Sequence, residues 1–279
     1  MKKNILTTLV ITAGIFAFIE AKAVEYQSPR TLALGGAGRA APLLNDSIYL
    51  NPSYASFTPI YSASGGYTWF NQGRNYNVSV QDSRTEMFQA GVAYTKREQS
   101  AALSFGASRA IIEHLGVGLG SKTILDNGTN KMTTDFLFST SFLATSFMYT
   151  TLVIDNLIES TGSKQKNLSR TFFLGFKFIP THEVEIFIDP LYSPNYNKGS
   201  KNGYSAGVEF GLLADFYLRF GKFKNAEVPH LNTRGEGFGM GVGWIGPRIN
   251  FDYAMNRVTA SHAGDPLTTA HALSTTIFF

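Results

Sequence analysis

Short segments in which apolar and polar residues alternate follow one another along the chain from about Pro59 to its end. Each segment is about eight to twelve residues long, and turn residues separate it from the next. Because successive side chains of a strand point to opposite faces, a period of two predicts strands with one apolar and one polar face. We expect about fourteen strands, with twelve as the alternative count, near residues 59–70, 74–82, 86–96, 99–108, 115–125, 134–142, 146–155, 170–179, 182–189, 203–212, 215–223, 236–245, 248–256 and 270–279.

The connections between these segments alternate in length. Long connections rich in Gly, Ser, Asn and Pro lie at residues 158–167, 190–202, 224–234 and 257–268, with tight turns at 180–181, 213–214 and 246–247 between them. Short turns at one end and longer loops at the other are typical of bacterial outer-membrane barrels, whereas a soluble β-sandwich has no reason for this alternation. The sequence therefore predicts an all-β fold, a closed antiparallel transmembrane barrel formed by residues 59–279.

The stretch from Phe136 to Ile154 carries no charge and is long enough for a transmembrane helix. Seven of its nineteen residues are Ser or Thr, and most of the others are aromatic or β-branched. These residue types favour strands. We therefore expect two strands joined near Ala144.

The last predicted strand has an apolar face that ends on Phe279. His271, Leu273, Thr275 and Ile277 share this face. The pattern is that of the assembly signal of outer-membrane barrels, so we expect the barrel-assembly machinery to recognise it. Pairing of the last strand with the first would remove the sheet edge, whose polar groups lipid cannot satisfy.

The first 23 residues resemble a secretory signal peptide. Lys2 and Lys3 precede an apolar stretch, and Ala21 and Ala23 form a small-x-small cleavage site. The apolar stretch is too short and too often interrupted for a membrane anchor. We expect export to the outer membrane of a Gram-negative-type bacterium, with residues 1–23 removed.

Composition excludes several other classes of protein. The 256 residues after Ala23 hold 21 basic and 19 acidic side chains without a basic run, so nucleic acid is not an expected partner. There is no cysteine for a disulfide or a thiolate metal site. The five histidines are scattered, and the glycine-rich run at Gly36 lacks the strand and helix of a dinucleotide site. We expect no enzyme activity, catalytic residue, metal or cofactor.

Strand parity places charged side chains inside the predicted barrel. If Phe176 and Phe178 face lipid, Lys177 faces the lumen, and Glu209 and Arg219 face each other across the next hairpin. Buried charges are tolerated in pairs of opposite sign. We expect either an ionic network that fills the lumen or a substrate path, formed by Lys177, Glu183, Glu185, Asp189, Glu209, Asp215, Arg219, Arg248 and Asp252.

Two inward strips without side chains are also expected. One consists of Gly116, Gly118 and Gly120, and the other of Gly237, Gly239, Gly241 and Gly243. Glycine permits close approach of another backbone. These strips could accommodate a plug or a ligand.

A series of motifs precedes the first strand. Residues 30–40 read RTLALGGAGRA, and Asn45-Asp46-Ser47 and Leu50-Asn51-Pro52-Ser53 follow. This series resembles the N-terminal segment of the FadL/PorV-type outer-membrane proteins, and later pieces such as residues 207–210 and 218–221 resemble their strands. The resemblance implies that residues 24–58 fold inside the barrel as a plug, with the motif residues Leu34, Gly35, Gly36, Gly38, Asn51 and Pro52.

The resemblance also implies that the barrel binds or passes a hydrophobic or lipid-like small molecule. One alternative is a non-transporting structural or assembly barrel, either a homo-oligomer or an anchor for partners. Another is a small polar porin, which requires the N-terminal segment to lie outside the lumen. Outer-membrane lipid is an expected partner throughout.

Overall fold

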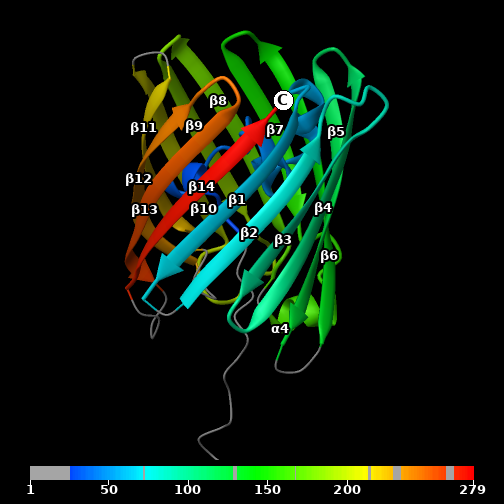
Figure 1. Ribbon diagram of the computed structural model, residues 1–279. Helices are drawn as coiled ribbons and strands as arrows, with labels where there is room; N and C mark the ends of the chain where they lie inside the picture. Colours follow the sequence, from blue (N-terminus) through cyan, green and yellow to red (C-terminus); the bar gives the residue numbers. More distant parts are fainter. Residues whose placement is uncertain are drawn as a thin grey trace, which may run out of the picture.

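The computed structural model describes residues 26–71, 73–127, 131–166, 168–212, 215–228, 234–261 and 267–279. The expected signal peptide lies outside these residues. Fourteen antiparallel strands form one closed barrel (Figure 1). The strands are β1(Tyr61–Phe70), β2(Gly73–Asp82), β3(Gln89–Arg97), β4(Ser100–Ile112), β5(Leu115–Asp126), β6(Met132–Thr145), β7(Met148–Asp155), β8(Thr171–Thr181), β9(Val184–Tyr192), β10(Asn202–Leu212), β11(Phe216–Glu227), β12(Arg234–Ile245), β13(Ile249–Ser261) and β14(Thr269–Phe278).

The barrel closes between its first and last strands, as predicted. β1 pairs with β14 from Ser62 opposite Phe278 to Phe70 opposite Ala270. The backbone N–H of Phe279 donates to the carbonyl of Tyr61 at 3.0 Å and extends the pairing by one residue. The count of fourteen strands is confirmed, and β6 and β7 form the expected hairpin in the uncharged stretch.

The two ends of the barrel differ. At the end where β1 begins and β14 finishes, short turns join β4 to β5, β6 to β7, β8 to β9, β10 to β11 and β12 to β13. The connection between β2 and β3 at the same end has six residues. The longer connections follow β7, β9, β11 and β13 at the opposite end, which we call the loop end. The loop after β7 carries α4(Thr161–Gln165), seen at the bottom of Figure 1. β11 and β13 extend four or five residues further into the loop end than their sequence patterns predict.

The outer wall of the barrel carries large apolar side chains. They alternate with inward residues along each strand, as the burial pattern of β2 shows. The most exposed of them on the strands include Val78 at 57 %, Val80 at 58 %, Leu119 at 61 % and Ile277 at 50 %. In the described part of the chain, no helix has the length and apolar character needed to cross a membrane.

Residues 26–58, here called the lumenal segment, lie inside the barrel (Figure 1). The segment contains α2(Pro29–Ala33), η1(Leu44–Asp46), α3(Ser47–Leu50) and η2(Pro52–Phe57). α2 begins at Pro29 after Ser28, whose Oγ accepts a hydrogen bond from the N–H of Thr31 at 3.2 Å. It ends before Gly35 and Gly36, whose φ angles of 67° and 90° suit glycine.

An apolar layer lines the lumen between the lumenal segment and the loop end. Its side chains come from β6, β7, β8, β9, β11 and β13 and the residues that follow β11. Phe173, Val153 and Val258 in this layer are at most 2 % exposed. Apolar side chains therefore face inward here as well as outward. The members of the layer are Leu137, Val153, Phe173, Leu191, Phe223, Ala226, Val228 and Val258.

Candidate lumenal site

A chain of alternating charges crosses the lumen from β8 to β13. Arg30 of α2 lies at its centre and donates from Nε to Glu209 Oε2 at 3.0 Å. On one side, Arg30 Nη2 lies 3.8 Å from Glu185, which binds Lys177 Nζ at 2.7 Å. On the other side, Glu209 binds Arg219, and Arg219 binds Asp252.

The electrostatics of Arg30 follow from these neighbours. Burial acts to lower the pKa of Arg30, but the charges of Glu209 and Glu185 outweigh it and raise the pKa above its ordinary value. Arg30 therefore stays charged, and it ties the lumenal segment to the barrel wall. The register that places Glu209 opposite Arg219 is the one expected from the sequence.

A second buried ion pair anchors the turn after α2. Asp189 Oδ2 on β9 accepts the backbone N–H groups of Gly38 and Arg39, both at 3.0 Å. The guanidinium of Arg39 lies 3.6 Å from the same carboxylate and stacks over the Phe173 ring, 3.6 Å from its centroid. Gly38, with φ of 120°, permits this turn.

Three residues of the expected ionic network do not belong to it. Glu183, Asp215 and Arg248 lie in the turns between β8 and β9, β10 and β11, and β12 and β13, where their side chains are exposed. The period-two pattern places a residue inward only while the strand continues, and at these positions the strand has ended or has not begun. The structure brings together Lys177, Glu185, Asp189, Glu209, Arg219 and Asp252.

The lumenal segment packs on the first glycine strip. A Cβ at Gly118 would overlap the backbone N of Ser53, and one at Gly116 would lie 2.7 Å from the Ser53 carbonyl oxygen. At Gly120 the nearest atom of the segment is Cγ of Pro52, at 3.4 Å. This strip on β5 therefore makes room for η2.

The second strip is divided between the segment and the wall. Cβ atoms at Gly239 and Gly241 would collide with Leu32 and Ala33 of α2. Gly237 instead lies against Phe223, and Gly243 against the side chains of Arg219 and Asp252. At Gly237 and Gly243 the nearest atoms belong to other residues of the wall and not to the segment.

The remaining motif residues are buried contacts of the segment. Leu34 packs on Gly207 and Gly221, two close approaches that no pattern in the sequence predicts. The amide of Asn51 donates to the carbonyl of Arg39 at 2.8 Å and to Ser141 Oγ at 2.8 Å. Asn51 is fully buried and thus joins two parts of the segment to β6.

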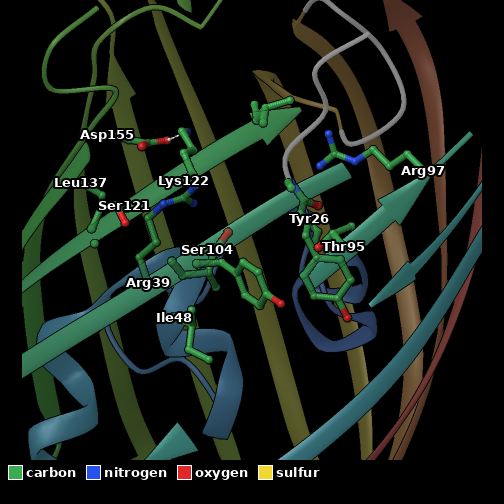
Figure 2. A pocket seen from close by; sticks show the side chains of 16 residues that line it. Tyr26, Arg39, Ile48, Thr95, Arg97, Ser104, Ser121, Lys122, Leu137 and Asp155 are labelled. Atoms are coloured by element: carbon green, nitrogen blue, oxygen red, sulfur yellow. Dashed lines mark hydrogen bonds and ion pairs between the residues drawn. The ribbon is translucent and has the colours of Figure 1, made fainter. Parts of the chain in front are cut away.

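A cavity of about 50 Å³ remains between the lumenal segment and the wall formed by β3 to β7 (Figure 2). Ile48 and Leu50 of α3 form one side, and Ala102, Ile124 and Leu137 belong to the opposite strands. Tyr26 and Tyr49, whose ring centroids are 4.8 Å apart, also line it. Much of the lining is therefore apolar or aromatic.

Charged side chains lie along the same cavity. Its described lining includes the cations Arg39, Arg97 and Lys122 and the carboxylate Asp155. Lys122 Nζ lies 2.9 Å from Asp155 Oδ2, the contact drawn as a dashed line in Figure 2. The cavity thus combines an apolar wall with charged side chains.

Comparisons with known proteins identify the fold. No family model matches the chain, and no curated protein matches its sequence. The solved structure of the CymD monoaromatic hydrocarbon channel is similar over 94 % of this chain and 99 % of that one, with a TM-score of 0.65 and 12 % identity. The Ralstonia pickettii toluene transporter TbuX matches 92 % of this chain and 99 % of its own, with a TM-score of 0.66 and 10 % identity.

A Pseudomonas aeruginosa FadL homologue is similar over 92 % of this chain and 99 % of its own, with a TM-score of 0.58 and 10 % identity. The fold is that of FadL-type outer-membrane barrels. These neighbours are transporters, channels or a homologue of one, and none is described as an enzyme. At this sequence identity, the similarity between this chain and the FadL-type barrels shows a shared fold alone.

Two arginines without a predicted role, Arg30 and Arg39, complete the charged groups of the lumen. The six expected residues that do meet there comprise four carboxylates and two cations. Arg30 and Arg39 raise the cations to four and balance the charge. An excess of inward carboxylates was the signal in the sequence that cations had to come from another part of the chain.

Proposed function

We propose that the protein is an outer-membrane barrel that binds a small hydrophobic or lipid-like molecule and passes it across the membrane. In this proposal residues 26–58 act as a plug, and the cavity in Figure 2 is the binding site. The observation that carries the proposal is the apolar wall formed by Ile48, Leu50 and Ile124 beside the charged side chains of the same cavity. Ligand pockets typically combine such a wall with a few polar groups that orient the guest.

The charges of the cavity favour a molecule with an apolar body and one acidic or polar end. The apolar body would lie against Ile48 and Ile124. The polar end would lie towards Lys122 and Arg39, whose cationic groups line the cavity.

In this proposal the plug moves when a ligand binds, because the cavity is small. An apolar cavity that holds benzene measures about 150 Å³. The cavity here is about 50 Å³, so a larger guest needs Ile48 or Leu50 to shift. Both residues belong to α3, which is not part of the barrel wall. The chain first joins the wall at β1.

Location and export are part of the same proposal. The apolar outer wall matches a lipid environment, and the FadL-type fold supports the outer membrane. We propose that residues 1–23 direct export and that the closing strand is recognised during assembly. The lumenal position of residues 26–58 disfavours the polar-porin alternative.

The test measures binding of radiolabelled laurate to the full chain in nanodiscs. Ala102→Phe places a ring in the cavity, and we expect it to weaken laurate binding at least about tenfold. Ala107→Phe on the outward face of the same strand is the matched control and should bind normally. Lys122→Gln should weaken laurate binding more than dodecanol binding. Equal laurate affinity of the two alanine variants would refute the site.

A further inference from the structure

The outer wall of the barrel carries a group of cations near the loop end. Lys222 and Lys224 lie on β11 and Arg257 on β13, and all three side chains are exposed. Figure 1 shows these two strands on either side of β12 at the left of the barrel. In the described residues, Lys224 has a carboxylate partner, Glu236, at 3.7 Å, and no ion pair is formed by Lys222 or Arg257.

The register brings the three cations to one patch. Lys222 is opposite Phe238 of β12, and Phe238 is opposite Arg257 of β13. Lys222 and Arg257 are thus two strand spacings apart, about 10 Å between backbones, with the Phe238 ring between them. Lys224 lies on the same face as Lys222, about 7 Å along the strand.

An open groove adjoins this patch at the loop end. Its volume is about 470 Å³, and Lys224, Glu236 and Tyr204 form its border with the outer wall. Lys198 and Asn202 line it from the loop after β9 and the start of β10. The groove therefore offers further donors beside the cations.

The placement of charge along the whole outer wall is uneven. Exposed cations at outward strand positions near the loop end also include Arg74 and Lys96, whereas Arg109 lies towards the turn end. A cation that faces lipid is costly unless it reaches the interface or an anion. The loop end is therefore the side of the barrel suited to an anionic lipid surface.

We propose that Lys222, Lys224 and Arg257 bind the phosphate groups of an outer-leaflet lipid, with the sugar or polar part of its headgroup in the adjoining groove. Phosphate accepts hydrogen bonds from Lys and Arg, and the Phe238 ring supports the acyl side of the same lipid. This inference rests on the proposed outer-membrane location. It is independent of what the lumenal cavity binds.

The experiment uses the full chain in detergent and native mass spectrometry with added bisphosphorylated lipid A. We expect one retained lipid A, and at least tenfold weaker retention in the double variant Lys222→Gln with Arg257→Gln. Arg109→Gln is the matched control and should retain lipid A like the wild type. Heat-modifiable migration in gel electrophoresis checks that each variant is folded. We expect the variants to fold, because neutral side chains on the lipid face favour insertion.

Three results would overturn the proposal. These are equal retention by the double variant and the wild type, equal retention of lipid A and an uncharged lipid, and displacement of lipid A by millimolar inorganic phosphate, which would indicate a site for free phosphate. Failure of the outer-membrane location itself is distinguishable, because the wild-type barrel would then not insert into vesicles at all.

Discussion

At the scale of single residues, Arg30 determines how the lumenal segment is held. It contacts carboxylates on two strands, β9 and β10, and donates from Nη1 to the carbonyl of Ala41 in its own segment at 3.1 Å. It also lies over the Phe187 ring. One side chain thus neutralises buried acids of the wall and orders the turn that follows α2. Removing one member of such a buried group typically costs about 3–5 kcal/mol, because its partners stay charged.

Asp46 is the residue from which we expect pH dependence. Burial raises its pKa to about 6, although a hydrogen bond from Ser28 Oγ and the charge of Arg30 act to lower it. In the unfolded chain Asp46 titrates near its ordinary value of 3.8. As pH rises from about 4 to about 6, the unfolded chain loses this proton first, so the contribution of Asp46 to stability falls across that window and is constant at higher pH.

The measurement is urea unfolding in vesicles at pH 4.5 and pH 7.5, followed by tryptophan fluorescence. Asp46→Asn keeps an acceptor for Ser28 but carries no charge. We expect it to stabilise the barrel at pH 7.5 by about 1–2 kcal/mol relative to the wild type, with a smaller difference at pH 4.5. Other groups near Asp46, namely Tyr26, Tyr49, Arg219 and Asp252, are unchanged in the variant. The same stability difference at both pH values would contradict this account.

At the scale of elements, the alternation of residues along each strand carries most of the information that the sequence holds. It predicts fourteen strands and the pairing of Glu209 with Arg219, because these depend on neighbours within one hairpin. It fails at Glu183, Asp215 and Arg248, since the alternation has no meaning beyond a strand end. It cannot show that Arg30 meets Glu209, a contact between residues 179 positions apart.

The glycines also show what the alternation of residues can and cannot predict. Alternation in β5 and β12 predicts strips that face inward. Which strand each part of the lumenal segment touches depends on the path of residues 26–58, which has no repeating pattern. The single inward glycines Gly207 and Gly221 receive Leu34 just as closely as the strips receive η2 and α2, but an isolated glycine gives no signal in the sequence.

Adjacent residues of β4 provide a test of strand parity. Leu103 is 52 % exposed on the outer wall, and Ser104 lines the lumenal cavity opposite Lys122. Leu103→Asp puts a carboxylate into lipid and should cost about 1–2 kcal/mol, less than a cation at the bilayer midplane does, with poor insertion. Ser104→Asp gains Lys122 as a neighbour and should insert nearly as the wild type does. The heat-modifiable fraction after assembly into vesicles measures the insertion of both variants. An equal loss of insertion in the two variants would mean that the strand register is displaced by one residue.

At the scale of the whole molecule, the lumen contains two layers with different chemistry. The apolar layer around Phe173 and Phe223 lies towards the loop end, and the lumenal segment with its ion pairs lies beyond it. The cavity beside Ile48 and Leu137 is bordered by both layers. Movement of the segment would therefore enlarge the cavity.

Deletion of residues 26–58 should convert the barrel into an open pore with a defined selectivity. The deletion removes Arg30 and Arg39 and leaves Glu185, Asp189, Glu209 and Asp252 with Lys177 and Arg219. Two carboxylates in excess favour cations in the lumen. Planar-bilayer recordings should show a steady conductance that the intact chain lacks, and the reversal potential in a KCl gradient should indicate cation selectivity.

A point variant provides the matched control for this deletion. A Cβ at Gly221 would overlap the backbone of Leu34, whereas one at Gly65 has no atom within 4 Å. Gly221→Ala should therefore displace the segment and increase the frequency of openings while Arg30 and Arg39 stay in the chain, and Gly65→Ala should behave as the intact protein does. Because the arginines are retained, openings of Gly221→Ala should be less cation-selective than those of the deletion. A deletion variant that folds but remains closed, or that prefers anions, would show that residues 26–58 do not block the lumen in this way.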